Sequence, residues 1–164
     1  MRKPEKDSLV QFYQSPDKQN QFDKTQNFMQ FREQNKNKSI MSTKFYKCRH
    51  CGNVIEKIVD HQVPVVCCGE KMEELVANTV EASVEKHLPV VTLLDECKLK
   101  VEVGSVAHPM LPEHHITFIY VETENGGVRV DLQDKPEAII CTYPHKPIAV
   151  YEYCNLHGLW KTVL

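Results

Sequence analysis

The sequence lacks a long apolar run, an export signal and any sustained helical periodicity. None of its apolar stretches approaches the roughly 18 to 20 consecutive residues that a membrane-spanning helix needs. The first residues contain no apolar run followed by a small-residue cleavage site. We therefore expect a cytoplasmic protein that does not enter a membrane and that is built from strands rather than helices.

A basic stripe, which a nucleic-acid-binding surface requires, is also missing from most of the chain. Residues 44–164 carry twelve Lys and Arg against seventeen Asp and Glu, whereas residues 1–43 carry eight against five. An acidic body is unsuited to a phosphate backbone, because binding there depends on cationic side chains that displace counterions. We therefore expect no nucleic-acid partner.

Cysteine, by contrast, is abundant, with seven residues in the chain. Without an export signal, these cysteines favour metal ligation in a reducing compartment over a disulfide framework. Their odd number also leaves at least one thiol unpaired. Metal binding is therefore the first functional prediction.

The N-terminal segment, residues 1–43, has a composition that cannot bury a core. It contains seven Gln and four Asn, with scattered Phe and no repeating apolar pattern. We predict that it is disordered or a non-native extension. Met41 stands directly before Ser-Thr-Lys-Phe-Tyr-Lys-Cys, so one interpretation starts the natural chain at Met41, and the other is a regulatory tail.

Residues 44–78 combine short apolar runs with four cysteines. This segment contains too few apolar residues to fold by hydrophobic burial alone. It therefore needs another stabilising element, such as a bound metal ion. The cysteines form two pairs, Cys48-x-x-Cys51 and Cys67-Cys68. Gly52 and Gly69 follow the two pairs, as tight turns around a metal require. We predict a tetrahedral site of four thiolates.

The pattern is less informative about which metal this site holds. Tetrahedral sulfur suits both zinc and iron, and the spacing alone modestly favours zinc. The direct adjacency of Cys67 and Cys68 should strain the tetrahedron. His50 and His61 lie nearby, but four thiolates already fill the shell, so we expect both histidines to be solvated.

After Glu74 the apolar runs lengthen into seven candidate strands. They are residues 75–80, 89–94, 99–106, 116–122, 128–132, 137–143 and 148–153. Leu99, Val101 and Val103 alternate with charged residues, as in strands with one buried and one wet face. Seven such strands predict an all-β fold with an immunoglobulin-like β-sandwich over residues 79–164, preceded by the four-cysteine domain over residues 44–78.

Histidines and a cysteine gather at three of the expected strand ends. They lie in Glu85-Lys86-His87, in His108-Pro109-Met110 with His114-His115, and in Cys154-Asn155-Leu156-His157. Loops at one end of a sandwich converge in space, so these segments can present ligands to a single metal ion. A lone histidine would by default be structural, but four with a cysteine favour a metal site.

These motifs resemble the desulfoferrodoxin family, the two-iron form of superoxide reductase. The resemblance covers residues 44–162, in order and at family spacing. It rests on Tyr46-Lys47-Cys48-x-x-Cys51-Gly52-Asn53, Cys67-Cys68-Gly69-Glu70-x-Met72, Glu85-Lys86-His87-x-Pro89-Val90, Gly104-Ser105-Val106-x-His108-Pro109-Met110 and Glu152-Tyr153-Cys154-Asn155-Leu156-His157-Gly158-x-Trp160-Lys161.

The resemblance implies two iron ions per chain. One would be held in a distorted tetrahedron, in place of the zinc that spacing favours, by Cys48, Cys51, Cys67 and Cys68. The catalytic iron would be held by His87, His108, His114, His157 and Cys154. His114 is chosen over His115 because the family places its third histidine six residues after the one in His-Pro-Met.

The implied activity is the one-electron reduction of superoxide to hydrogen peroxide, with a rubredoxin-type electron donor and a homodimer as the assembly. Lys86 would attract the anion and assist proton delivery. Glu85 would supply the sixth ligand once the iron is ferric. Because we expect this segment to be extended, the two neighbours would take turns facing the iron. The four-cysteine iron would relay electrons or serve the structure.

The sequence departs from the family in its N-terminal extension, in Leu111-Pro112, where more polar residues are expected, and in two cysteines without a ligand position. We predict that Cys141 is buried within a strand and that Cys97 lies near a turn. Two other functions stay open at this point. One is a rubredoxin-like electron carrier working through the four-cysteine iron, and the other is a zinc-stabilised interaction module.

Overall fold

The computed structural model describes residues 43–95 and 98–164. Strands make up nearly all the regular structure of these residues, and the one helix among them, α2 (Val84–His87), has four residues. The predicted all-β fold class is confirmed. No helix within the described ranges is long and apolar enough to cross a bilayer. The predicted N-terminal extension, including the alternative start at Met41, lies outside the described residues except for Thr43.

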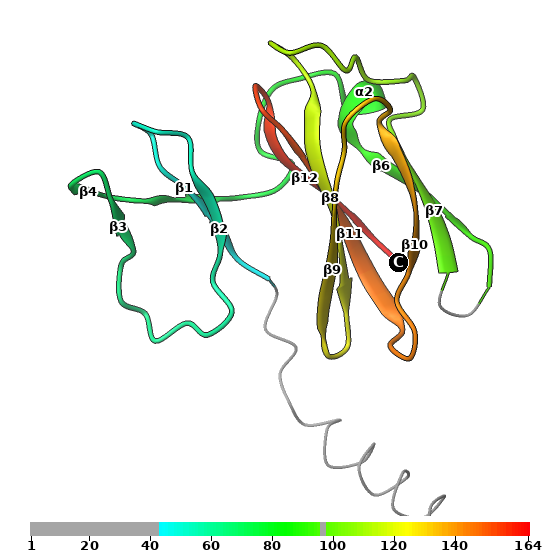
Figure 1. Cartoon of the computed structure of the whole chain (residues 1–164), viewed down its shortest axis with the longest axis horizontal. Coiled ribbons are helices and arrows are strands. Elements are labelled where there is room, and N and C mark those ends of the chain that lie inside the picture. The colour runs from blue at the N-terminus through cyan, green and yellow to red at the C-terminus, as the bar shows by residue number, and fades with distance from the viewer. Residues whose placement is uncertain (1–42, 96–97) are drawn as a thin grey trace, which may run out of the picture. The chain divides into compact units, whose positions relative to one another are not determined.

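The N-terminal strands, which we call the ribbon (residues 43–75), are very short. They are β1 (Phe45–Lys47), β2 (Val54–Glu56), β3 (Val66–Cys67), β4 (Glu70–Lys71) and β5 (Glu73–Leu75). One sheet has the order β2-β1-β5, and β3 pairs with β4 in a separate hairpin (Figure 1). Within the ribbon, only Phe45, Cys48 and Met72 are buried. Apolar burial therefore contributes little to its stability.

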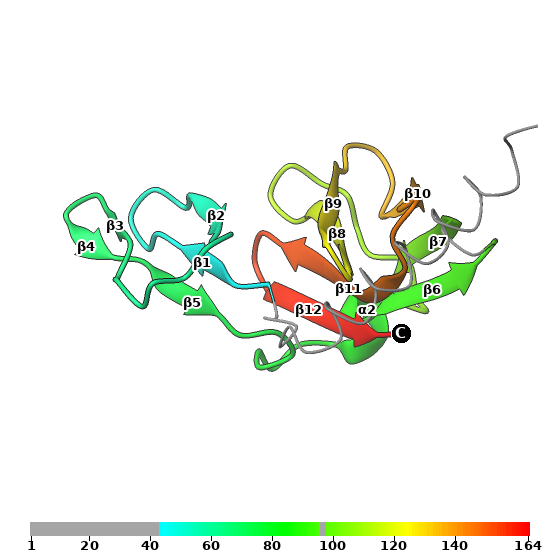
Figure 2. The same ribbon diagram turned by 90° about the horizontal axis from the view of Figure 1, so that it is seen from below.

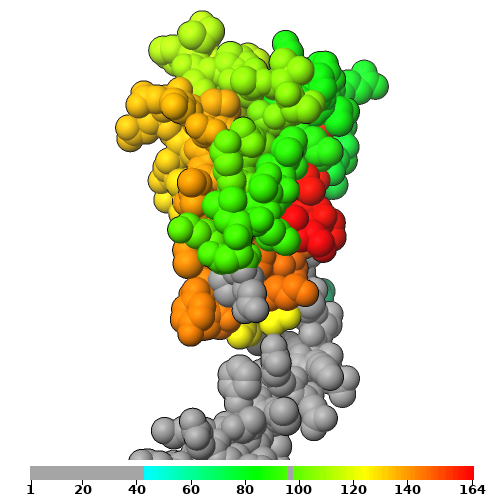
Figure 3. Space-filling view, turned by 90° about the vertical axis from the view of Figure 1, so that its right-hand side faces the viewer, coloured from blue at the N-terminus to red at the C-terminus, as the bar shows by residue number. Residues whose placement is uncertain are grey.

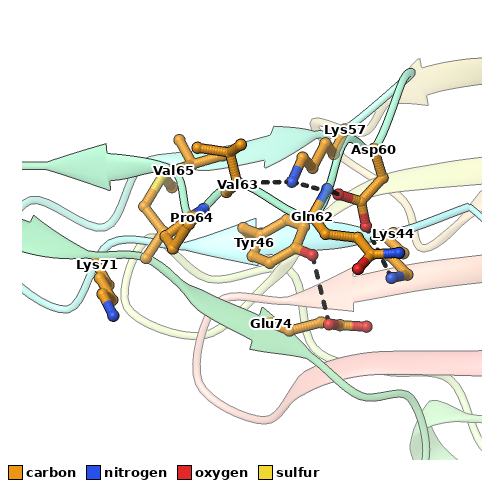
Figure 4. A pocket seen from close by; sticks show the side chains of 11 residues that line it. Lys44, Tyr46, Lys57, Asp60, Gln62, Val63, Pro64, Val65, Lys71 and Glu74 are labelled. Atoms are coloured by element: carbon orange, nitrogen blue, oxygen red, sulfur yellow. Dashed lines mark hydrogen bonds and ion pairs between the residues drawn. The ribbon is translucent and has the colours of Figure 1, made fainter.

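Charge, rather than apolar burial, fixes the connection between β2 and β3. The Asp60 carboxylate lies 2.5 Å from Lys57 Nζ and 2.9 Å from Lys44 Nζ. Its Oδ1 also accepts the backbone N–H of Gln62 at 2.7 Å, and Lys57 donates to the Val63 carbonyl at 2.8 Å (Figure 4). These residues line a pocket of about 380 Å³. The connection is thereby held in a shape that returns the chain to the second cysteine pair.

The strands that follow, which we call the sandwich (residues 89–163), form two antiparallel sheets. They are β6 (Pro89–Leu93), β7 (Lys98–Val103), β8 (Ile116–Thr123), β9 (Gly126–Asp131), β10 (Glu137–Cys141), β11 (Pro147–Cys154) and β12 (Gly158–Val163). The sheets have the orders β10-β7-β6 and β12-β11-β8-β9 (Figures 1 and 2). This division into three and four strands is that of an immunoglobulin-type sandwich.

The main core lies between the two sheets. Leu99, Val101 and Val103 point inward from β7, since each is fully buried while its neighbours are exposed or half-buried. The same core includes Ile116, Ile119, Val121, Ile140, Val150 and Cys154. Because Cys154 belongs to this cluster, the last residue of β11 is anchored by the core itself.

The outer face of β8 and β11 is also buried, because the ribbon packs on it. The centroid of the Phe45 ring lies 5.8, 5.2 and 5.7 Å from those of Phe118, Tyr120 and Tyr151. The Tyr120 hydroxyl also donates to the Glu56 carboxylate at 2.6 Å. A second apolar cluster therefore joins the ribbon to the sandwich.

The seven strands of the sandwich are not quite the seven predicted. The candidate strand 75–80 ends at Leu75, and the strand β12 was not predicted. Gly158 has a positive φ of 73°, which closes the tight turn from β11 into β12. Asn78 also has a positive φ, of 61°, which breaks the expected strand, and it binds β12 through hydrogen bonds instead.

Cys141 is exposed, so the prediction that it is buried was wrong. Within β10, Ile140 points into the core, while Ile139 and Cys141 point outward. Figure 3 views the molecule from the side of this three-stranded sheet, where β6, β7 and β10 meet solvent. Alternation along the strand set the outcome, because only one of two neighbouring residues can face the core. Cys97 lies outside the described residues.

Candidate metal centres

Five predicted ligands meet at one end of the sandwich. His87 ends α2, His108 and His114 lie between β7 and β8, Cys154 ends β11, and His157 lies in the turn that follows. Figure 1 shows α2, the β7–β8 connection and the β11–β12 turn at the same end. The donor atoms of the five residues all lie within 4.8 Å of one another. Segments 70 residues apart thus supply a single cluster.

The four imidazoles form a closed ring of neighbours. The centroid distances are 4.8 Å for His87 and His108, 4.5 Å for His108 and His114, 4.8 Å for His114 and His157, and 4.7 Å for His157 and His87. Each pair is close to perpendicular, with interplanar angles from 69° to 83°. Cys154 Sγ lies 3.6 Å from His108 Nε2 and 3.5 Å from His157 Nδ1. The thiol therefore sits directly against this ring.

Backbone carbonyls orient two of the histidines. His87 Nδ1 lies 2.8 Å from the Ser83 carbonyl, and His108 Nδ1 lies 2.7 Å from the Pro109 carbonyl. A carbonyl only accepts, so each Nδ1 carries the proton and each Nε2 presents a lone pair to the centre. His114 Nε2 is buried, and no group within residues 43–95 and 98–164 forms a hydrogen bond with it. Converging lone pairs and an orphaned nitrogen fit a cation.

Burial favours the neutral form of His87, His108 and His114. Desolvation lowers the pKa of His87 and His114, and it lowers the pKa of His108 to about 4, with further lowering from the neighbouring imidazoles. Burial also raises the pKa of Cys154, although the backbone amides of His157 and Leu156 oppose this. Neutral imidazoles are the ligand form, and a bound cation would draw the proton from the thiol.

Trp160 contacts two of the candidate ligands, although the sequence analysis predicted no role for it. Its ring stacks on His87, with centroids 5.0 Å apart and planes 18° apart. Its Nε1 donates to the carbonyl of His157 at 3.2 Å. Trp160 is buried. The sequence signal that could have pointed to it is that it is the only tryptophan of the chain.

Glu152 is a second buried residue that the sequence reasoning missed. It lies two residues before Cys154 on the inner face of β11, and neither carboxylate oxygen has a hydrogen-bond partner in the part of the chain that the structure describes. Burial raises its pKa to about 9. Burial therefore favours the neutral form of this carboxyl, and negative charge on it raises the pKa of Cys154.

Glu85 and Lys86 lie in α2, so the expected extended segment was wrong. A leucine and a proline follow His87, and the helix ends there at Leu88, whose N–H still bonds to the Val84 carbonyl. Both side chains are exposed. The Glu85 carboxylate accepts a short hydrogen bond from the Ser83 hydroxyl, which lowers its pKa. In this conformation Glu85 is bound to Ser83 rather than to the histidines.

The four predicted cysteine ligands also come together, at the tip of the ribbon. Their sulfur atoms all lie within 4.8 Å of one another. The Sγ atoms of Cys51 and Cys67 are 3.6 Å apart, and those of Cys67 and Cys68 are 3.9 Å apart. Cys68 has a positive φ of 53°, an unfavourable conformation for a residue with a side chain. The strain expected from adjacent cysteines is thus located in the backbone of Cys68.

Hydrogen bonds within this cluster divide the thiols into two kinds. Backbone amides, that of Cys51 first, lower the pKa of Cys48 to about 6. Hydrogen bonds with neighbouring thiols, led by Cys51, raise the pKa of Cys68 to about 12. Four thiolates so close together repel one another unless a cation lies between them, so the donor set fits a metal ion.

The remaining candidates stay outside both clusters. His50 and His61 are exposed, as predicted, and His50 Nε2 lies 3.0 Å from the Glu70 carboxylate. His115 is partly exposed, with its Nδ1 3.1 Å from the Leu111 carbonyl. Leu111 itself is 52 % exposed beside the histidine cluster.

Comparisons with known proteins agree with this geometry. The family described as Desulfoferrodoxin matches residues 79–163. The chain is 44% identical to a desulfoferrodoxin of Syntrophotalea carbinolica over 71% of this chain and 93% of the relative. It is 42% identical to that of Nitratidesulfovibrio vulgaris, over 71% of this chain and 92% of the relative. The solved superoxide reductase of Treponema pallidum is similar, with a TM-score of 0.62, 33% identity, and coverage of 74% of this chain and 99% of that chain.

Proposed function

This chain belongs to the desulfoferrodoxin family, and we propose that it is a superoxide reductase. The reaction adds one electron and two protons to superoxide and yields hydrogen peroxide. The observation that carries the proposal is the closed ring of four imidazoles with a cysteine sulfur beside it. This donor set suits iron better than a closed zinc tetrahedron, because it offers five ligands rather than four.

In this proposal the protein's own residues prepare the site. The iron ligands would be His87, His108, His114, His157 and Cys154. Ferrous iron bound there would supply the electron and leave room for a small anion. The carbonyls of Ser83 and Pro109 orient the rings of His87 and His108, and the Trp160 ring stacks on His87, so these ligands need little rearrangement.

Lys86 and Glu85 would serve the approach of the substrate and the oxidised state. Lys86 is an exposed cation one residue from His87, and its charge acts on both His87 and His114. A cation at that place raises the local concentration of an anion and can order water for proton delivery. Glu85 would supply a carboxylate oxygen to the ferric ion after leaving Ser83.

The ribbon would hold a second iron through Cys48, Cys51, Cys67 and Cys68. We propose that this iron relays electrons or stabilises the ribbon, with domains at residues 44–78 and 79–164. The electron donor would be a rubredoxin-type protein and the assembly a homodimer. A cytoplasmic location, with a role in oxidative-stress detoxification, is proposed because thiolate ligands need a reducing compartment.

Metal analysis and a visible spectrum of the purified protein, followed by superoxide addition to the reduced form, test the proposal. We expect two irons per chain and one peroxide formed per superoxide consumed. A colourless zinc protein would instead indicate an interaction module. Redox cycling of the four-cysteine iron without faster superoxide loss would indicate an electron carrier. Either result would overturn the proposed activity.

A further inference from the structure

One side chain joins the two loops that carry His114 and Cys154. Asn155 follows Cys154 directly and reaches the connection between β7 and β8. Its Oδ1 accepts the backbone N–H of His115 at 2.9 Å, and its Nδ2 donates to the Glu113 carbonyl at 2.9 Å. Its own backbone N–H donates to the His115 carbonyl at 3.1 Å. Three hydrogen bonds thus tie residue 155 to both neighbours of His114.

His114 depends on these bonds more than His87 and His108 depend on theirs. A carbonyl holds the ring of each of those two histidines, whereas the His114 ring makes no hydrogen bond to another described residue. Among the described residues, the backbone of His114 pairs with Leu111 alone, through two hydrogen bonds of 3.0 Å that close a tight turn. The position of the His114 ring therefore depends on the hydrogen bonds between this turn and Asn155.

We propose that Asn155 is a positioning residue that holds His114 in the ring of four imidazoles. The inference rests on the proposed function only in taking that ring as the iron site. A carboxamide suits the task because it offers a donor and an acceptor in one plane, and the backbone around His114 presents one carbonyl and one N–H. Aspartate lacks the donor, and alanine lacks both groups.

The expected size of the effect follows from how such supporting residues behave elsewhere. Replacing a group that orients a metal ligand typically weakens metal binding by about 10- to 100-fold. We expect Asn155→Ala to weaken iron binding at the histidine cluster within this range. Asn155→Asp, which keeps the acceptor, should weaken it by about tenfold.

The chain offers a matched control in Asn78. Its Nδ2 donates to the Lys161 carbonyl at 3.0 Å, its Oδ1 accepts the Lys161 N–H at 2.8 Å, and its backbone N–H donates to the Leu159 carbonyl at 3.0 Å. These are the same three kinds of hydrogen bond that Asn155 makes, but the residue between Leu159 and Lys161 is Trp160, which is not a candidate ligand. Asn78→Ala should therefore lower thermal stability but leave the iron bound. Because this variant loosens the segment that carries Trp160, its iron binding is read from total iron rather than from Trp160 emission.

Trp160 provides a readout that does not depend on activity. It is the only tryptophan in the sequence, and its ring lies against His87. Iron bound by His87 should quench its fluorescence, and loss of that iron should restore it. Visible absorption reports separately on the iron at the four-cysteine centre of the same molecule.

The experiment titrates the full-length, iron-loaded protein and its three variants with a ferrous chelator. Trp160 emission then gives the iron affinity of the histidine cluster, and total iron is measured beside it. We expect weaker binding in both Asn155 variants, wild-type binding in Asn78→Ala, and unchanged retention at the four-cysteine centre in all of them.

Wild-type iron affinity in both Asn155 variants would overturn the positioning role. So would an equal loss in Asn155→Ala and Asn78→Ala, because the effect would then come from general loosening. If circular dichroism shows that Asn155→Ala does not fold, the nearly isosteric Asn155→Asp decides. A wild-type protein whose emission is never quenched by iron would instead contradict the proposed function.

Discussion

The two candidate centres of this protein differ in what holds their ligands. In the ribbon, the cysteines lie in turns and at the ends of two- and three-residue strands, and Cys51 and Cys68 are exposed. In the sandwich, His87, His108 and Cys154 are buried, and Cys154 belongs to the core between the sheets. One centre is thus built on turns and the other on a packed scaffold.

From this difference we infer that the ribbon needs its metal ion to fold, whereas the histidine cluster does not. The ribbon has three buried residues, and four close thiols in it favour a cation between them. The histidine cluster is arranged by carbonyls, by the Trp160 ring and by core packing before any ion binds. We therefore expect metal, packing and charge to affect the two regions unequally.

Metal removal should separate the two regions most strongly. In zinc-finger peptides, metal binding supplies about 10 to 16 kcal/mol of folding free energy, and the ribbon resembles them in its small core. We expect the metal-free protein to lose hydrogen-exchange protection in the peptides covering β1 to β5, while β7, β8 and β11 stay protected. A His114→Ala variant, which affects only the other centre, is the control. Persistent protection of the ribbon would contradict the prediction.

Phe45→Ala should break the packing between the two regions. The side chain is 3 % exposed and touches three aromatic rings of the sandwich. We expect the free energy of unfolding, measured with denaturant, to fall by about 3 to 5 kcal/mol. Tyr143→Ala, at a side chain that is 79 % exposed, should change it by less than about 0.5 kcal/mol. A similarly small change in the free energy of unfolding in both variants would mean that packing against the sandwich does not stabilise the ribbon.

Asp60→Asn tests how far charge stabilises the ribbon. Hydrogen bonds from Lys57 and then Lys44 hold the pKa of Asp60 well below its usual value. A lowered folded-state pKa stabilises above the unfolded value of about 3.9, and the contribution is lost as the pH falls toward the folded pKa. The variant should therefore melt at a lower temperature than wild type at pH 7, and the gap should shrink below about pH 4.

A double-mutant cycle assigns that effect to its partner. In a Lys57→Met background, the same Asp60→Asn change should lower the Tm by less, because the two groups interact directly. If the gap between wild type and Asp60→Asn is constant from pH 7 to pH 3, the carboxylate charge does not stabilise the ribbon.

Lys86→Ala should give the smallest effect, and on rate rather than stability. Loss of the cation beside His87 should slow the second-order reaction with superoxide by up to about tenfold and flatten its dependence on ionic strength. Lys71→Ala removes an exposed lysine near the four-cysteine centre and should leave both properties unchanged. Pulse radiolysis at several salt concentrations measures both, and equal behaviour of the two variants would refute the role of Lys86.

The fold class and the membership of both clusters were predictable from local sequence patterns. Alternation along β7 fixed its inward face, because successive side chains of a strand point to opposite sides. The spacing of the cysteines and histidines named both clusters, because turns and strand ends bring such residues together. Gly158 also indicates a turn. The strand that begins at this residue, β12, was not predicted, because its first residues belong to the motif that contains Cys154 and His157.

The contacts that support these residues, in contrast, depend on how the sheets and loops pack together. The short helix at Glu85 and Lys86 depends on neighbours that no local pattern encodes, and sheet packing decided that Ile140 rather than Cys141 faces the core. The stacking of Trp160 on His87 and the reach of Asn155 to both sides of His114 join segments 73 and about 40 residues apart. Such contacts form only when the sheets pack, because packing, not sequence proximity, sets which side chains meet.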